Sequence, residues 1–176
     1  MEVRVLLEGV QDADIKESGK YEVICRAMCS SVTLIKGKQN ILVDTGNIGF
    51  GDNVLGALGQ QGLKAEDINL VIITHNDLDH CANVGLFKNA EVIAGRALWH
   101  STGGYVLYRK LEEIEVEGVK LISTPGHFQR HQSVVIKSHG KTYVIAGDAI
   151  KELVIRNPGL ADYMSNDYIQ SAKKNI

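Results

Sequence analysis

The sequence predicts an α/β fold in which sheets and helices pack in layers. The first third of the chain is rich in alternating and β-branched residues, which is typical of strands. Further along, short apolar runs alternate with helical stretches, and this order favours sheets covered by helices. The 176 residues are enough for one sizeable core, and no repeat or linker-like segment interrupts them. We therefore expect a single domain spanning residues 1–176.

Each predicted element has its own signal. Strands are expected where apolar and β-branched residues alternate or run together between turn signals such as Gly37-Lys38. Helices are expected where the apolar spacing lengthens, and the first of them ends at a glycine. The predicted strands are Val3–Leu7, Tyr21–Cys25, Ser31–Lys36, Asn40–Asp44, Leu70–Thr74, Glu91–Ala94, Val119–Ser123, Gln132–Lys137 and Tyr143–Ala146, and the predicted helices are Phe50–Gly62, Asn83–Phe87 and Asp162–Lys174.

Composition excludes several classes of protein. The net charge is only −2 and no basic run appears, so a nucleic-acid-binding tail is not expected. No stretch of 18 apolar residues exists, so we expect no transmembrane helix and no membrane partner. The first residues alternate like a strand rather than forming a signal peptide, and a cytoplasmic location is the expectation.

The segment from Thr74 to His80 carries the strongest chemical signal. His75, Asp77, Asp79 and His80 follow directly on the apolar run Leu70–Ile73. Imidazoles and carboxylates at this density near a core are costly unless a cation holds them together. If the segment is extended, His75 and Asp77 face one side and can bind one cation. The adjacent Asp79 and His80 diverge and can bind a second one.

Two more candidate ligands follow other predicted strands. His127 lies in Thr124–His127 after one strand, and Asp148 follows Gly147 after another. Such positions, just beyond the carboxyl ends of strands, commonly carry the chemistry of α/β proteins. A carboxylate such as Asp148 has two oxygens and can bridge two metals. We interpret His100, His131 and His139 as surface or structural residues rather than ligands.

This pattern resembles the metallo-β-lactamase superfamily, whose usual motifs are His-x-His-x-Asp-His, Gly-His and Gly-Asp. Here His75-x-Asp77-x-Asp79-His80, Gly126-His127 and Gly147-Asp148 stand in the same order. Residues 74–87 and 124–135 are similar to the small metallo-β-lactamase domain-containing protein 1 type. The resemblance implies a four-layer αββα sandwich with the metals at one edge of the sheets. It also implies that Asp44 organises a loop near the site.

The sequence departs from the family pattern at two points. Asp77 replaces the usual histidine, which resembles the His-x-Glu-x-Asp-His pattern of the di-iron branch. The sequence given stops at Ile176, before the last strand and final histidine that members usually carry. We therefore expect a C-terminally short fold, a weaker second metal position, and a homodimer that covers the C-terminal sheet edge. Three carboxylates favour iron or manganese relative to the family's zinc.

The resulting expectation is a metal-dependent hydrolase of an ester, thioester or phosphodiester. A metal-bound hydroxide would attack, and Asp79 would orient it or accept a proton. The alternatives are a di-iron redox protein and a metal-binding protein without catalysis. The substrate is expected to be a small molecule or nucleotide-type compound. The resemblance also implies RNA as a possible substrate, but the sequence shows no basic, aromatic-interleaved patch that would bind RNA. Residues 47–51 and 96–109 are the loops expected to carry specificity.

Overall fold

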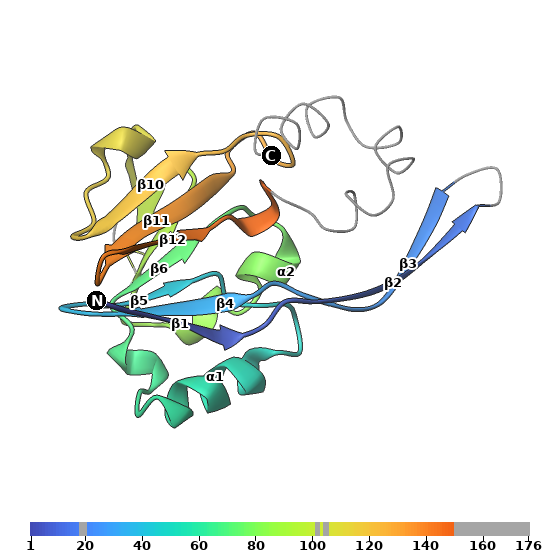
Figure 1. The fold of residues 1–176 in the computed structure, drawn as a ribbon, viewed down its shortest axis with the longest axis horizontal. Helices are drawn as coiled ribbons and strands as arrows, with labels where there is room; N and C mark the ends of the chain where they lie inside the picture. The colour runs from blue at the N-terminus through green and yellow to red at the C-terminus, as the bar shows by residue number, and fades with distance from the viewer. Residues whose placement is uncertain (18–20, 101–102, 104–105, 150–176) are drawn as a thin grey trace.

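The computed structural model describes residues 1–17, 21–100, 103 and 106–149. Two sheets pack face to face, and a helix covers the outer face of the larger one (Figure 1). The larger sheet has seven strands in the order β1-β4-β5-β6-β7-β8-β9. Strands β5, β6 and β7 are parallel to each other, and the remaining pairs are antiparallel. These strands are β1 (Glu2–Leu7), β4 (Val32–Lys36), β5 (Asn40–Val43), β6 (Leu70–Ile73), β7 (Glu91–Ala94), β8 (Ala97–Trp99) and β9 (Val106–Tyr108).

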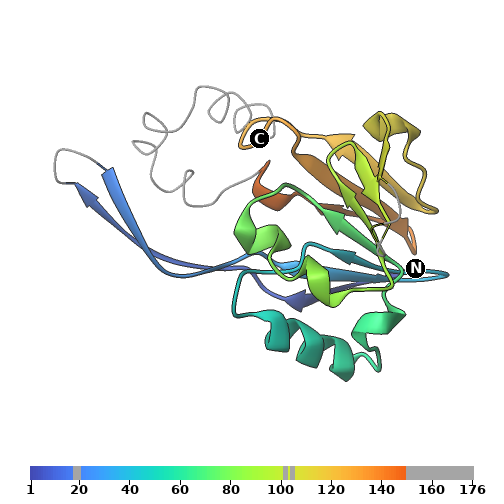
Figure 2. The same ribbon diagram turned by 180° about the vertical axis from the view of Figure 1, so that it is seen from behind.

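The second sheet is antiparallel and consists of β10 (Val119–Ser123), β11 (Gln132–Ser138) and β12 (Lys141–Ile145) in the described part of the chain. A separate hairpin is formed by β2 (Val10–Glu17) and β3 (Tyr21–Cys29). Figures 1 and 2 show this hairpin extending away from the body of the molecule. The helical elements are α1 (Gly51–Gln60), the single turn α2 (Leu78–Cys81) and the 3-10 turns η1 (Ala65–Asp67), η2 (Val84–Leu86), η3 (Leu111–Glu113) and η4 (Gly147–Ala149).

The core has two parts, one on each face of the seven-stranded sheet. Alternate residues of β6 point to opposite faces, so Val71 packs toward α1 while Leu70 and Ile72 pack toward the second sheet. On α1, Val54 and Leu58 are fully buried against the first face. Each such side chain contributes about 1.5–3 kcal/mol when it leaves water. The continuous apolar run of β6 is thus explained by burial on both faces, as expected.

The predicted layers are confirmed as an α/β sandwich, and all nine predicted strands are present with small shifts at their ends. The described residues supply three layers, namely α1 and the two sheets. The helix predicted over Asp162–Lys174 lies outside the described residues. The predicted helix over Asn83–Phe87 is a single 3-10 turn.

Three strands were not expected. The hairpin strand β2 was missed, and β8 and β9, with three residues each, lie within residues 96–109, which were expected to be loop. The one-turn helix α2 also replaces part of the extended segment expected after β6, because the chain turns at Asp77.

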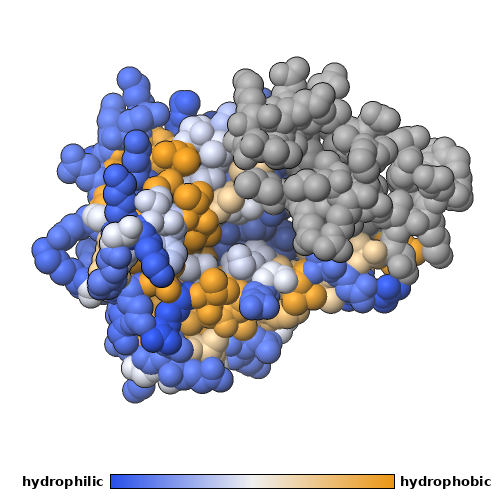
Figure 3. Space-filling model, viewed as in Figure 1, coloured by the Kyte–Doolittle hydropathy of each residue, from blue (hydrophilic) through white to orange (hydrophobic). Residues whose placement is uncertain are grey.

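The surface of the sandwich is mixed. On the face drawn in Figure 3, hydrophobic residues gather in the middle of the described part and hydrophilic residues surround them. Val5 on β1 and Val144 on β12 are among the exposed large hydrophobic side chains. None of the helices in the described ranges has the length and apolarity that a membrane crossing requires.

Candidate metal centre

Six predicted site residues come together at one edge of the sandwich. They lie beyond the ends of β6, β10 and β12, where these strands leave the core. The two sheets are tied at this edge because the backbone N–H of Gln132 donates to the carbonyl oxygen of Thr74 across 2.9 Å. The side chain of Gln132 also donates to the carbonyl of Ile73. The residues brought together are His75, Asp77, Asp79, His80, His127 and Asp148.

The first half of the centre is formed by His75, Asp77 and His127. Oδ2 of Asp77 lies 2.9 Å from Nε2 of His127 and 3.3 Å from Nε2 of His75. Asp77 occupies the N-cap position of α2, yet its carboxylate makes no cap hydrogen bond. An aspartate at such a position normally binds the helix N-terminus. Here the side chain faces the two imidazoles instead.

Asp148 lies between the two halves of the centre. Its Oδ2 is 3.5 Å from Nε2 of His127 and 3.8 Å from Nε2 of His75. Its Oδ1 is 3.3 Å from Nε2 of His80. The two oxygens thus face different histidines, which is the arrangement that a bridging carboxylate needs.

Asp79 lies at the margin of the cluster. Its Oδ2 is 3.6 Å from Nε2 of His80. Among the described residues, two sets of three side chains have ligand atoms mutually within 4.8 Å: His75, Asp77 and His127, and His75, His80 and Asp148. Asp79 belongs to neither set, although it is well buried at 12% side-chain exposure. Asp79 therefore contacts His80 from one side of the cluster.

Asp44 contacts Thr74 and His80 next to the cluster. Its carboxylate accepts hydrogen bonds from the backbone N–H and the hydroxyl of Thr74, at 2.7 and 2.8 Å. The same carboxylate lies 2.8 Å from Nδ1 of His80. Because Nδ1 is engaged there, the Nε2 atom of His80 is the one left to face Asp148.

The electrostatics of the centre favour a cation. Burial alone would lower the pKa of His80, but hydrogen bonds to Asp148 and Asp44 outweigh it and raise that pKa to about 10. Burial and the nearby His80 lower the pKa of His75. The Nε2 atom of His75 is buried, and it makes no hydrogen bond within the described part of the chain. An orphaned imidazole nitrogen facing carboxylates is the donor set that a divalent metal takes, so the residues fit such an ion.

His131 is the site residue that the sequence did not reveal. The interpretation that it is structural rather than a ligand agrees with its contacts, but its closeness to the centre was unexpected. The side chain is 1% exposed, and its Nε2 accepts a hydrogen bond from the backbone N–H of Asp148 at 3.1 Å. Its ring centroid is 5.0 Å from that of His75. Burial, with the neighbouring His75, lowers the pKa of His131 to about 4.

The hydrogen bonds around His131 form a series in which each group accepts from one neighbour and donates to the next. Since Nε2 accepts from Asp148, Nδ1 carries the proton and donates to the hydroxyl of Thr124 at 2.8 Å. The Thr124 hydroxyl then donates to Ser133, whose own hydroxyl donates to the carbonyl of Ala146. This series of hydrogen bonds connects Ala146 and Asp148, the neighbours of Gly147, to the β10–β11 loop.

Gly147 allows this close approach. Its φ is +55°, and a Cβ there would lie 2.8 Å from Nε2 of His131 and from the Thr74 side chain. Any other residue at this position would displace the loop that carries Asp148. The remaining histidines stay outside both three-residue sets among the described residues. His139, for example, bonds to Ser138 in the β11–β12 turn.

Comparison with known proteins agrees with this arrangement. The family model described as the metallo-β-lactamase superfamily matches residues 27–105. A metallo-β-lactamase domain-containing protein 1 from Xenopus laevis is 36% identical over 124 residues, covering 67% of this chain and 53% of the relative. A protein named "Probable metallo-hydrolase" from Methanocaldococcus jannaschii is 33% identical over 147 residues, covering 84% and 66%. The chain spans about half the length of the metallo-β-lactamase domain-containing protein 1 relatives.

Solved structures show the same fold. The crystal structure of a protein from Thermotoga maritima described as a "putative metallo-beta-lactamase" superposes with a TM-score of 0.69 at 21% identity, covering 98% of this chain and 90% of that one. A dizinc quorum-quenching lactonase in complex with a product superposes with a TM-score of 0.66 at 18% identity, covering 88% and 68%. The sequence relatives, the family model and the shared fold place the site described above in a known architecture. The chain belongs to the metallo-β-lactamase superfamily.

Proposed function

We propose that this protein is a metal-dependent hydrolase that acts on an ester, thioester or phosphodiester. The observation that carries the proposal is the position of Asp148, whose two oxygens face His80 on one side and His75 and His127 on the other. Relatives in the superfamily are named as hydrolases, and some are named as N-acyl homoserine lactonases, which act on a cyclic ester. These names support hydrolysis of an ester bond as the reaction class.

The proposed ligands divide into two positions. One position is formed by His75, Asp77, His127 and Asp148, and the other by Asp79, His80 and Asp148. Zinc is the metal suggested by the dizinc lactonase. The third carboxylate, Asp77, favours harder cations, so we propose iron or manganese as the alternative occupants. In both positions the metal would be bound by imidazole nitrogens and carboxylate oxygens.

The chain's own groups have distinct roles in this proposal. Bound divalent metals would supply an activated water nucleophile and polarise the substrate oxygen. Asp79, at the margin of the cluster, orients the nucleophile or accepts its proton. Asp44 holds His80 in the orientation that presents Nε2 to the site. His131 holds the backbone of Asp148 in place.

The test uses protein loaded with zinc, manganese or iron and a panel of esters, thioesters and phosphodiesters. The expected result is turnover of at least one class, lost on chelation and lost in Asp148→Ala. Asp52→Ala is the matched control, because Asp52 is an exposed acid on α1, on the opposite face of the large sheet. Activity that survives in Asp148→Ala with a metal-depleted site would refute the mechanism.

A di-iron redox protein is the second candidate function. The observation that favours it is the position of Asp77, whose carboxylate lies 2.9 Å from Nε2 of His127 and 3.3 Å from Nε2 of His75. Three carboxylates suit iron better than a histidine-rich site does. Iron found in protein purified without added metal, together with a visible charge-transfer band, would support this function. A protein that binds metal but turns over nothing in either assay would support the third alternative, a metal-binding member without catalysis.

We also propose a homodimer and a small-molecule or nucleotide-type substrate. Among the described strands, β12 has a neighbour on one side only, and such an edge can pair with a second subunit. Light scattering at micromolar concentration tests the dimer, and a monomer would contradict it. RNA as a substrate and the cytoplasmic location stay predictions.

A further inference from the structure

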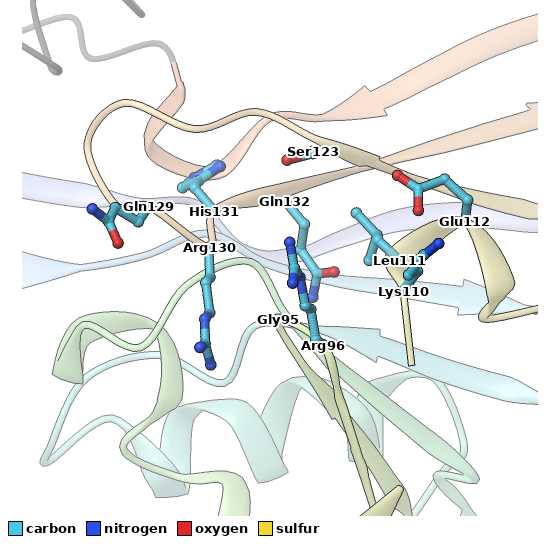
Figure 4. A pocket seen from close by; sticks show the side chains of 10 residues that line it. All are labelled: Gly95, Arg96, Lys110, Leu111, Glu112, Ser123, Gln129, Arg130, His131 and Gln132. Carbon is cyan, nitrogen blue, oxygen red and sulfur yellow. The ribbon is translucent and has the colours of Figure 1, made fainter. Parts of the chain in front are cut away.

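A basic pocket lies beside the candidate metal centre. Two adjoining pockets of about 320 and 410 Å³ share the residues Arg96, Lys110 and Arg130. They are formed by the β7–β8 turn, the segment around η3 and the loop before β11. Figure 4 shows the side chains that line the first pocket, with Arg96 between Arg130 on one side and Lys110 and Glu112 on the other. A volume of this size suits a small-molecule site.

The charge of the pocket is opposite to that of the chain. Four cationic side chains, from Arg96, Arg109, Lys110 and Arg130, line the two pockets with only Glu112 and Glu113 as counter-charges. Two positive charges are therefore in excess, whereas the whole chain carries −2. Within the described residues, none of these four cations makes an ion pair. Glu113 is already engaged, because it accepts a hydrogen bond from the backbone N–H of Lys110.

The backbone holds the arginines in this arrangement. Gly95 has a φ of +59°, and a Cβ on it would lie 3.4 Å from the Cβ of Arg130 and 3.6 Å from its Cδ. The stem of Arg130 therefore packs on the bare glycine. The backbone N–H of Arg109 donates to the carbonyl of Arg96 at 3.0 Å, which ties these two residues together next to the paired strands β8 and β9. A guanidinium group whose stem is packed in this way loses less entropy when it binds an anion.

The pocket and the metal centre share a wall. His131 and Gln132 line the pocket, and Gln132 is anchored to the carbonyl of Ile73 at the end of β6. On its other side, the ring of His131 stands 5.0 Å from the ring of His75. His131 is thus both a lining residue of the pocket and a neighbour of the candidate ligand His75.

We propose that this pocket binds an anionic group, a phosphate or a carboxylate, carried by the substrate whose ester bond is cleaved at the metal centre. This inference rests on the proposed hydrolase function and specifies its substrate class. Guanidinium groups match the oxygens of both anions with paired hydrogen bonds. Arg96 and Arg130, which line both pockets, determine this specificity, and Lys110 adds a third positive charge.

The first experiment compares three nitrophenyl esters that differ only in their far end, which is neutral, a carboxylate or a phosphate. The variant is Arg96→Gln/Arg130→Gln, and the matched control is Lys120→Gln/Lys137→Gln, which removes the same charge from exposed positions outside the pocket. We expect kcat/KM to fall about tenfold or more for the anionic esters in the pocket variant only. The ratio between the two anionic esters shows which anion the pocket prefers.

Two results of this comparison would overturn the proposal. One is an equal loss on the neutral ester, which would give the arginines a structural role. The other is an equal loss in the lysine control, which would assign the effect to the overall charge of the surface.

A second experiment separates this proposal from the hydrolase proposal. Inorganic phosphate, and in a parallel series acetate, is titrated into chelator-treated full-length protein at low salt, and backbone amide NMR shifts are followed. We expect saturable shifts of Gly95, Arg96 and Arg130 with at least one of the two anions, abolished in the pocket variant and retained in the lysine control. If these shifts appear but no ester is turned over, anion binding by the pocket is supported and the hydrolase proposal is wrong. If neither anion shifts these amides, the pocket proposal is wrong even if esters are hydrolysed.

Discussion

Oδ2 of Asp44 lies 2.8 Å from Nδ1 of His80, and both side chains are almost completely buried. The same carboxylate accepts two hydrogen bonds from Thr74, so one residue fixes the end of β6 and the orientation of a candidate ligand. Asp44 itself has a φ of +58°, a conformation that aspartate and asparagine tolerate better than most residues. The position therefore requires both a short polar side chain and an unusual backbone.

Replacing Asp44 should destabilise the protein in a graded way. In Asp44→Ala the buried backbone N–H of Thr74 loses its partner, which costs about 1–3 kcal/mol, and Nδ1 of His80 keeps only its 3.2 Å contact with the Thr74 hydroxyl. Asp44→Asn keeps an acceptor oxygen and the backbone preference, so a smaller loss of the free energy of unfolding is expected. Urea denaturation of metal-free protein measures both. An Asp44→Ala variant as stable as Asp44→Asn would contradict this account.

The position of Asp148 predicts the metal content of its variants. If its two oxygens serve two metals, Asp148→Asn retains one good acceptor oxygen and should keep about one equivalent of metal, while Asp148→Ala should fall below one. Elemental analysis after dialysis measures the stoichiometry, with Asp52→Asn as the control. Equal metal content in Asp148→Asn and the parent protein would show that bridging is not needed.

The candidate ligands could be proposed from the sequence because all six stand in short, recognisable motifs. His75, Asp77, Asp79 and His80 are dense in the sequence, and His127 and Asp148 stand in a Gly-His and a Gly-Asp pair shortly after strands. They converge because the two sheets pack face to face, which brings the ends of β6, β10 and β12 to one edge. The pairing of oxygens with individual histidines depends on side-chain rotation, and only the structure provides it.

His131 shows why the rest could not be predicted. Its partners Thr124 and Asp148 lie 7 and 17 residues away, and one of its contacts is a backbone N–H that no side-chain pattern reveals. The basic pocket was hidden for a similar reason, since Arg96 and Arg130 are far apart in sequence and meet through the packing of two loops. No charge run indicates such a site.

The strands that were missed are stabilised by pairing rather than by composition. β8 and β9 have three residues each and pair at the edge beside β7. β2 contains Asp12 and Asp14, which have low strand propensity, but it pairs along its length with β3. By contrast, β5, β6 and β7 are apolar and lie inside the sheet, so their sequences alone predict them.

Asp77→His should shift the metal preference toward zinc. The change replaces a carboxylate 2.9 Å from His127 with an imidazole, which removes one negative charge from the cluster. Competition between equal concentrations of zinc and manganese, followed by elemental analysis, should show a higher zinc-to-manganese ratio than in the parent protein. Asp52→His controls for an added surface histidine. An unchanged ratio would mean that Asp77 does not ligate the metal.

The stability of the metal-free protein should depend on the protonation of His131. Its pKa is lowered to about 4 by burial, against 6.5 in the unfolded chain, so between these values the unfolded state binds more protons. Stability is therefore lost as the pH falls from 6.5 toward 4, with a contribution of up to about 1.4 kcal/mol per pH unit from this one group.

The variant that isolates this contribution is His131→Gln, whose amide can accept from the backbone of Asp148 and donate to Thr124 without titrating. Denaturation curves at pH 7, 6, 5 and 4 in the presence of chelator should show a shallower decline for His131→Gln than for the parent, while His139→Gln, at an exposed turn, should follow the parent. The lowered pKa of His75 acts in the same direction in all three proteins and cancels in the comparison. Parallel curves for His131→Gln and the parent would show that folding leaves the pKa of His131 unchanged, and the account of a buried, neutral imidazole would then be wrong.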